Sequence, residues 1–227
     1  MHMNNYINSQ TIPISKPDKL IAMTFDDGPS KTTMVEVLEL LKKYDAKATF
    51  FIVGRKINDI TLPVLQRAYS EGHELANHSF SHLHMAELSD EEILREYENC
   101  QKIVRDTLGV EMYYFRPPFG NVDDRMYRLI PAPFMMCGAS AGDGTRLGSN
   151  AEQRISKLLG KAYDGCIALM HCFEGNTETV KALETILPEL TSQGYKFVTL
   201  TELYHKAGCQ IPPPTPLVKF RDNKPLE

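Results

Sequence analysis

The sequence predicts an α/β fold, in which a parallel sheet is wound into a (β/α) barrel with helices outside it. Short apolar runs alternate with segments of helical periodicity over roughly two hundred residues, which is typical of a parallel sheet. About seven or eight strand-and-helix units occur, and this number favours a barrel over an open sheet. Polar side chains follow directly after most of the predicted strands. In a parallel barrel these positions share one rim, where active sites are built.

The composition is that of an ordinary globular protein and excludes several classes of function. Of the 227 residues, 42% are hydrophobic and 24% are charged, which suits one large domain or two small ones. The net charge of −4 gives no reason to expect a nucleic acid or an anionic membrane as a partner. No apolar stretch is long enough to cross a bilayer, and we expect no signal peptide within this chain. The five cysteines are an odd number without CxxC spacing, so neither a disulfide framework nor a thiolate zinc site is expected.

The first half of the chain contains three predicted strands and three predicted helices. Two apolar runs, the second of them closed by Gly54, are expected to be buried strands. The helices are predicted from apolar residues that recur at helical spacing. The longest helix has an N-cap at Ser89 and a stop signal at Gly109. In chain order these elements are strand 20–23, helix 32–44, strand 48–53, helix 62–70, strand 74–77 and helix 90–108.

The second half repeats the alternation of strands and helices. One predicted strand ends at Arg116-Pro117-Pro118, and the next runs into Gly142-Asp143-Gly144. A long helix is predicted after the strand that ends near His171, despite the proline inside it. In chain order these elements are strands 112–115 and 134–141, helix 151–159, strand 166–170, helix 178–193, strand 195–198 and helix 201–206.

A single domain is expected over 18–210. Residues 1–17 are polar and irregular and are interpreted as an N-terminal extension or linker. Residues 211–227 contain Pro212-Pro213-Pro214-Thr215-Pro216 and are interpreted as a Pro-rich, extended C-terminal tail. A membrane anchor, if the full-length protein has one, is expected upstream of this chain.

Two adjacent acids stand where the first predicted strand gives way to a turn. Asp26 and Asp27 are followed by Gly28-Pro29, which force the turn, and Ser30 is a candidate cap for the next helix. Two neighbouring carboxylates repel each other unless a cation is near or one of them holds a proton. For this short motif alone, a solvated turn is the more common structure, so its meaning depends on the rest of the rim.

Two histidines four residues apart supply the second half of a candidate metal site. On a helical turn His78 and His82 would face the same way, as zinc-binding histidine pairs do. With one carboxylate they form three protein ligands and leave an open position, which is the arrangement of catalytic zinc. One acid of the Asp26-Asp27 pair then binds the metal, and the other is free to act as a base toward metal-activated water.

The remaining polar residues of the rim match the other needs of acyl hydrolysis. His171 is placed to protonate a leaving group, and Arg116 and Asp143 offer opposite charges to hold a base and an acid in their charge states. A backbone N–H in the turn Pro118-Phe119-Gly120 can serve a developing oxyanion. Each residue also has an ordinary structural interpretation: a salt-bridge arginine, a core histidine and, favoured for Asp143 by itself, a turn aspartate between glycines. His73, His84 and His205 are not expected to take part.

Four ordered motifs, which together span most of 20–205, resemble those of one family. They are Thr24-Phe25-Asp26-Asp27-Gly28-Pro29, the run Gly72 to His82, Arg116-Pro117-Pro118-Phe119-Gly120 and Ile167-Ala168-Leu169-Met170-His171. The family is the polysaccharide deacetylases of carbohydrate esterase family 4, the NodB-homology domain. The resemblance implies a distorted, incomplete (β/α) barrel and removal of acetyl groups from N-acetylglucosamine polymers or acetylated xylan.

The resemblance also implies a role for each matching residue. Asp26 corresponds to the catalytic base, and Asp27, His78 and His82 to the ligands of a divalent metal, for which zinc is expected and cobalt or nickel are alternatives. The remaining matches are Arg116, which orients the base, Asp143, which tunes the acid, His171 as that acid, the Phe119 N–H beside Pro118 in the oxyanion hole, and Leu169 against the acetyl methyl.

Three positions depart from the family pattern. Phe119 stands where tyrosine is common, which is a mild change because only the backbone is used there. Gly144 replaces a tryptophan, and the chain has no tryptophan at all, so an aromatic wall for the sugar is missing. Cys172 replaces an aspartate that often follows the histidine of the last motif. These changes affect substrate fit and turnover more than reaction type.

The leading hypothesis is a metal-dependent deacetylase of N-acetylglucosamine residues in peptidoglycan, with chitin-type oligomers as a further substrate. The first alternative is an O-acetyl esterase on acetylated xylan, and the second is a catalytically weak, metal-binding carbohydrate-binding domain. Phosphoryl transfer through an aspartyl nucleophile would need acidic metal ligands in place of the histidine pair and is discounted. A monomer at the cell surface or outside the cell is expected from the resemblance, with a glycan as its partner.

Overall fold

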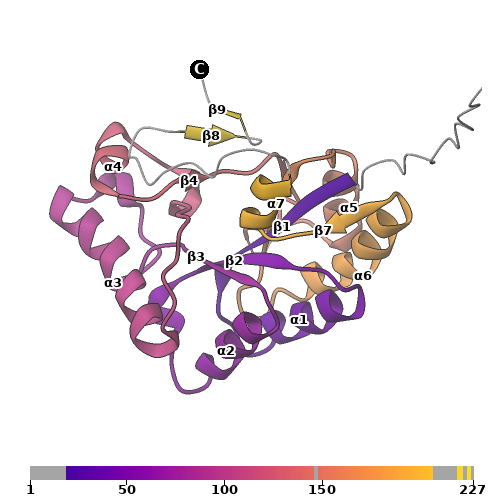
Figure 1. Cartoon of the computed structure of the whole chain (residues 1–227), viewed down its shortest axis with the longest axis horizontal. Helices are drawn as coiled ribbons and strands as arrows, with labels where there is room; N and C mark the ends of the chain where they lie inside the picture. The colour runs from indigo at the N-terminus through magenta and orange to yellow at the C-terminus, as the bar shows by residue number, and fades with distance from the viewer. Residues whose placement is uncertain (1–18, 146–147, 207–218, 222–223, 226–227) are drawn as a thin grey trace, which may run out of the picture.

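A computed structural model of the chain describes residues 19–145, 148–206, 219–221 and 224–225 (Figure 1). Its centre is a parallel sheet of six strands, in the order β3-β2-β1-β6-β5, with β7 paired to the start of β1. These strands are β1 (Lys19–Gly28), β2 (Ala48–Ile52), β3 (Glu74–Asn77), β5 (Ala139–Ser140), β6 (Cys166–His171) and β7 (Tyr195–Phe197). The α/β class and the parallel sheet are confirmed.

The sheet continues beyond β3 as single bridges rather than as a full strand. Phe115 bridges Asn77 on one side and Phe134 on the other, and Phe134 begins β4 (Phe134–Met135). The prediction of a strand over 112–115 is therefore wrong except at its last residue. Pro117 and Pro118 follow at once and have no N–H to donate, so pairing cannot continue.

The predicted strand over 134–141 is two short strands. β4 lies beside Phe115, whereas β5 pairs in parallel with β6 at Ala139 and Ser140. The chain therefore leaves one partner and reaches another within a few residues, and no ladder joins β5 to β4 in the described part of the chain. The circuit of strands is open between them, as an incomplete barrel requires.

The helices lie outside the strands (Figure 1). The long helix α3 is confirmed with its ends: Ser89 forms a capping box with Glu92, and Gly109 closes it in the left-handed conformation at φ 68°. The seven helices of the described residues are α1 (Thr33–Lys43), α2 (Leu62–Ser70), α3 (Asp90–Leu108), α4 (Asp124–Leu129), α5 (Ala151–Leu159), α6 (Thr177–Ser192) and α7 (Leu200–Lys206). Of these, α4 is not predicted by the sequence pattern, and none has the length and apolar character that a bilayer crossing needs.

Two of the predicted segments lie largely outside the described residues. These are the N-terminal extension 1–17 and the proline run 212–216. From the predicted tail, the structure describes β8 (Lys219–Arg221) and β9 (Lys224–Pro225), and β8 pairs in parallel with β4.

Alternation along β1 fixes which side chains reach the inside of the barrel. Ile21, Met23 and Phe25 are buried in the main core, which packs against helices such as α1 and α6. Ala22 belongs to a second cluster on the opposite face. Thr24 and Asp26 share that face with Ala22, because side chains two apart on a strand point the same way. The strand therefore delivers its first acid to the interior side of the rim.

Candidate active site

The two acids occupy the last residues of β1 and not a turn beyond it. The strand runs to Gly28, and its register with β2 shifts between Phe25 and Gly28. Asp27 has φ 69°, which lies in the left-handed region that few residues other than glycine adopt. This irregularity cancels the usual alternation of neighbouring side chains. Both carboxylates therefore approach one imidazole nitrogen, His78 Nε2, at 3.7 Å from Asp26 and 3.8 Å from Asp27.

His78 and His82 do not lie on a helical turn, so this part of the prediction is wrong. They belong to an irregular loop after β3, with φ 68° at Ser79 and φ 56° at His82. The loop is held by local hydrogen bonds: Asn77 Oδ1 accepts from the Ser79 N–H at 2.8 Å, and Ser79 Oγ accepts from the His82 N–H at 3.0 Å. The two rings still meet, with centroids 5.0 Å apart.

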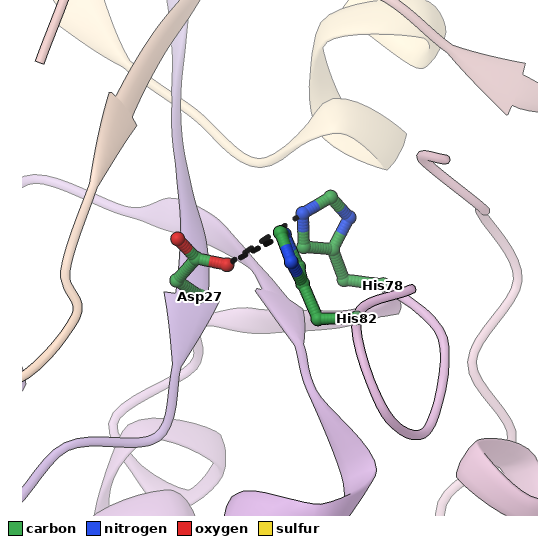
Figure 2. A group of neighbouring side chains, drawn as sticks. All are labelled: Asp27, His78 and His82. Atoms are coloured by element: carbon green, nitrogen blue, oxygen red, sulfur yellow. Dashed lines mark ion pairs between the residues drawn. The ribbon is translucent and has the colours of Figure 1, made fainter. Parts of the chain in front are cut away.

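Asp27, His78 and His82 converge from two elements into one donor set (Figure 2). His82 Nε2 lies 3.0 Å from Asp27 Oδ1, and one ligand atom from each of the three residues lies within 4.8 Å of the others. Two imidazoles and one carboxylate are the ligand types of a catalytic zinc site. The residues present therefore fit a divalent metal.

The surroundings prepare His78 as a metal ligand. Its Nδ1 lies 2.6 Å from the Arg116 carbonyl oxygen, which accepts a hydrogen bond only from a protonated Nδ1. The lone pair is thereby left on Nε2, which faces the acids. Complete burial lowers the pKa of His78, which favours the neutral form that binds a metal. Burial acts to raise the pKa of Asp27, but the hydrogen bond with His82 and the charge of His78 outweigh it and keep Asp27 ionised.

Asp26 is held by a buried arginine. Arg116 Nη1 donates to Asp26 Oδ1 at 2.7 Å and to Thr24 Oγ1 at 2.9 Å, and both side chains of the ion pair are about 4% exposed. Arg116 Nε donates to the Met135 carbonyl at 2.8 Å, and its guanidinium lies 3.9 Å above the Phe51 ring. Several contacts fix this cation, so it orients the Asp26 carboxylate and leaves Oδ2 toward the donor set.

His171 and Asp143 form the second charged pair of the rim. His171 Nδ1 lies 2.9 Å from Asp143 Oδ1, and the His171 backbone N–H donates to Asp143 Oδ2 at 2.8 Å. Burial acts to lower the pKa of His171, but the hydrogen bond with Asp143 and the charge of Asp26 outweigh it and raise the pKa above its ordinary value. The structure thus favours a protonated imidazole whose Nε2 is available to give up a proton.

Sequence reasoning missed the residues that hold Asp143. Thr179 Oγ1 donates to Asp143 Oδ2 at 2.6 Å, and Asn176 Nδ2 donates to the His171 carbonyl at 2.9 Å. Arg154 is 2% exposed and its Nη1 donates to both Asn176 and Thr179. A helix-periodic pattern gives no reason to single out these three residues. The one signal in the sequence is that Arg154 lies on the side of the predicted helix 151–159 that its apolar residues occupy.

The turn that follows Arg116 presents a backbone donor. Phe119 lies in a short 3₁₀ turn (Pro118–Gly120) with φ 60°, and its N–H has no hydrogen-bond partner among the described residues. Its side chain is 58% exposed and stacks on His84, with ring centroids 3.9 Å apart. His84 thus forms part of the wall near His82, although it lies outside the donor set. Pro118 is buried and Leu169 is half-buried on β6, beside Thr24 in register.

Gly144 and Cys172 lie close to the two charged pairs. A Cβ atom at Gly144 would lie 3.3 Å from both Cε1 and Nε2 of His171, so the loop passes close to the imidazole. A side chain at this position would press on the imidazole, which would have to shift by a few tenths of an ångström. Cys172 is buried, and its N–H donates to the Asp26 carbonyl. Burial raises the pKa of its thiol well above the ordinary value, which makes it a neutral packing residue.

The fold and the rim together define a class of protein: a (β/α) domain of the hydrolase type, in which a buried carboxylate, a histidine–aspartate pair and a set of possible metal ligands meet at the carboxyl ends of the strands. The chain belongs to the polysaccharide deacetylase family, whose model matches residues 14–131. The resemblance drawn from the four motifs is confirmed.

Two of the known relatives differ in the activity that their names give. The chain is 42% identical over 190 residues to a bifunctional xylanase/deacetylase of Pseudobutyrivibrio xylanivorans, which covers 84% of this chain and 31% of the relative. It is 36% identical over 198 residues to a peptidoglycan-N-acetylglucosamine deacetylase of Bacillus cereus, which covers 85% of this chain and 92% of the relative. The chain therefore spans about a third of the first relative and most of the second.

A solved structure repeats the fold. A family 4 acetyl xylan esterase from Clostridium thermocellum, in complex with a cobalt ion, superposes with a TM-score of 0.82 at 36% identity, over 90% of this chain and 98% of that chain. This similarity supports the incomplete barrel, and the cobalt ion of that enzyme agrees with a metal-dependent family.

Proposed function

We propose that this protein is a metal-dependent deacetylase that removes the N-acetyl group from N-acetylglucosamine residues of peptidoglycan and releases acetate. The observation that carries the proposal is the position of Asp26. Its carboxylate is locked by Arg116 at 2.7 Å, and its second oxygen faces His78 Nε2 of the donor set at 3.7 Å. A carboxylate so held is suited to accept a proton from a water molecule beside the donor set.

The residues of the site have distinct roles in hydrolysis. Asp27, His78 and His82 hold the cation, which when bound polarises the acetyl carbonyl and acidifies water. Asp26 accepts a proton as water adds to the carbonyl carbon. The Phe119 N–H donates to the oxyanion that forms. His171 then protonates the amine nitrogen as the C–N bond breaks, and Asp143 holds the imidazole in its protonated form.

Zinc is the proposed metal, with cobalt or nickel as alternatives. A set of two imidazoles and one carboxylate suits zinc, and the same nitrogen and oxygen donors bind cobalt and nickel. The substrate places the reaction at the cell wall, outside the cell. The glycan is the proposed partner, and a monomer suffices because every residue of the site comes from one chain.

Deacetylation of acetylated xylan is the second candidate function. The xylanase/deacetylase and the acetyl xylan esterase that resemble this chain favour it. The catalytic roles would be unchanged, since an ester and an amide share the same carbonyl addition step. The two functions differ in the leaving group, an alcohol oxygen or an amine nitrogen, and in the sugar that the rim accepts.

Acetate release tests both candidates and the metal. Metal-free and zinc-reloaded protein are compared on peptidoglycan fragments, chitin oligomers and acetylated xylan. Zinc-dependent release from the N-acetyl substrates is expected. Release from acetylated xylan alone would show that the protein is an acetyl xylan esterase instead. Tight zinc binding without release from any substrate would favour a carbohydrate-binding domain and would point to Gly144, which takes the place of the tryptophan.

A further inference from the structure

The geometry points to a second part of the substrate site: a cavity beside the donor set that binds a carboxylate carried by the sugar next to the one that loses its acetyl group. This inference rests on the proposed function and names the substrate class within it, an acidic rather than a neutral glycan. The cavity measures about 470 Å³, a size typical of small-ligand pockets. Its lining residues include Pro29, Lys31, Arg55, Lys56 and Phe173.

The cavity lies at the same rim as the catalytic residues. Pro29 comes two residues after Asp27 at the end of β1, and Phe173 comes two residues after His171 at the end of β6. Lys56 ties the two regions together, because its Nζ donates to the Asp27 backbone carbonyl at 2.7 Å. A glycan whose acetyl group lies at the donor set would therefore place an adjacent sugar against this cavity.

The charge of the lining is positive. Lys31 and Arg55 are exposed, and neither side chain forms an ion pair with any of the described residues. Lys56 keeps two further donors after its bond to Asp27. The one acid of the lining, Glu174, already serves the start of α1: it accepts from Lys31 N–H at 2.9 Å and from Thr32 Oγ1 at 2.8 Å.

The rest of the lining suits a sugar rather than a free anion. Phe173 is half-buried, and Ile60 is 66% exposed, so an apolar surface lies beside the three cations. A saccharide with one carboxylate offers both kinds of contact, since its C–H groups cover the apolar part and its charge meets Arg55. Arginine is also the side chain whose planar fork matches a carboxylate.

Two glycans can carry such a carboxylate: peptidoglycan, on those muramic acid residues whose lactyl group has no stem peptide attached through an amide, and xylan, on uronic acid branches. The test uses pairs that differ only in charge. One pair is a tetrasaccharide of alternating N-acetylglucosamine and N-acetylmuramic acid with free lactyl carboxylates, and the same compound with those carboxylates as amides. The other pair is acetylated xylooligosaccharides with and without a glucuronic acid branch.

The measured quantity is the ratio of kcat/KM for the acidic over the neutral member of each pair, with zinc-loaded protein. For the substrate pair whose glycan the protein deacetylates, we expect a ratio of about three to ten. The ratio should be lower at high salt, because salt screens the attraction between the carboxylate and the cations. Arg55→Gln should bring the ratio toward one, and Arg55→Glu should bring it below one. Arg95→Gln on α3, which removes an exposed arginine elsewhere, is the matched control and should keep the ratio. Zinc content verifies that each variant retains the metal site.

A ratio of one in the wild-type protein, or a ratio that both Arg55 variants leave unchanged, would overturn the inference while leaving deacetylation intact. Absence of acetate release from every substrate would instead refute the proposed function. In that case the carboxylate-binding cavity is tested by calorimetry, through the affinities of the same acidic and amidated oligosaccharides for the zinc-loaded protein. Tighter binding of the acidic compound would support the cavity, and equal affinities would refute it.

Discussion

At the scale of single residues, the site depends on one conformational exception. Asp26 and Asp27 are neighbours on a strand and would point to opposite faces if the strand were regular. The positive φ of Asp27 and the register shift beside it bring both carboxylates to His78 Nε2. The division of labour between them follows from their other contacts: Asp26 is bound by Arg116, and Asp27 by His82.

Replacing Asp26 by asparagine should separate metal binding from catalysis. The asparagine would keep the shape of the side chain and an oxygen for Arg116, but an amide does not accept the proton of water. We expect Asp26→Asn to retain zinc and to lose activity by roughly 10²- to 10⁴-fold, the usual contribution of a general base. Zinc stoichiometry and acetate release measure the two properties separately. Wild-type turnover in this variant would remove Asp26 from the role of base.

The raised pKa of His171 predicts the alkaline side of the pH–activity profile. The imidazole acts as an acid only while protonated, so activity should be present below its raised pKa and should fall as the pH rises through it. Asp143→Asn removes the hydrogen-bonding charge that helps to raise this pKa, so the alkaline limb of kcat/KM should move to lower pH. Asp106→Asn, at an exposed position of α3, is the control. An unmoved limb would show that another group sets it.

At the scale of elements, the loop after β3 decides whether two histidines become one donor pair. Four-residue spacing brings them together on a helix, but here a left-handed residue at each of two positions does so instead. Such conformations persist only where surrounding contacts impose them. Those contacts come from the loop itself, through Asn77 and Ser79, and from Arg116, whose carbonyl orients His78.

The hydroxyl of Ser79 should therefore influence metal affinity without touching the metal. Ser79→Ala removes the acceptor of the His82 N–H, so we expect zinc affinity to fall about tenfold, as is usual for residues that orient metal ligands. A competition titration against a chelator measures it. Ser81→Ala makes the same chemical change in the same loop, at a hydroxyl without a hydrogen bond to any described residue, and should leave affinity unchanged. Equal effects of the two variants would show that the contact at Ser79 is not responsible.

At the scale of the whole molecule, the metal site joins segments that are far apart in the chain. Asp27 lies near the end of β1, whereas His78 and His82 follow β3, and β2 lies between these strands in the sheet. A cation bound by all three residues would crosslink the end of β1 and the loop after β3. Because the unfolded chain does not keep the three ligands together, binding should stabilise the folded state.

Zinc should raise the melting temperature of the wild-type protein, by several degrees when zinc is well above its dissociation constant. His78→Ala and His82→Ala should each abolish this zinc-dependent rise, whatever their effect on the metal-free protein. Scanning calorimetry with and without zinc gives the difference directly. His205→Ala, which changes a histidine on α7, is the control and should respond like the wild type. A full zinc response in His78→Ala would contradict the assigned ligands.

The sequence by itself determined the class of fold, most of its helices and strands, and the candidate catalytic residues. The reason is that apolar periodicity fixes an element locally, and the end of a parallel strand fixes the rim to which its next residue belongs. Asp26, Arg116, Asp143 and His171 were located in this way. The four motifs together then identified the family.

Only the tertiary structure decided how these residues meet. Whether Phe115 forms a strand depends on partners remote in sequence and on the prolines that follow it, and whether His78 and His82 share a site depends on backbone angles that spacing does not encode. The buried network of Arg154, Asn176 and Thr179 behind Asp143 follows from the packing of α5 and α6. Local patterns cannot report such contacts, because each one joins residues that only the folded chain brings within hydrogen-bond distance.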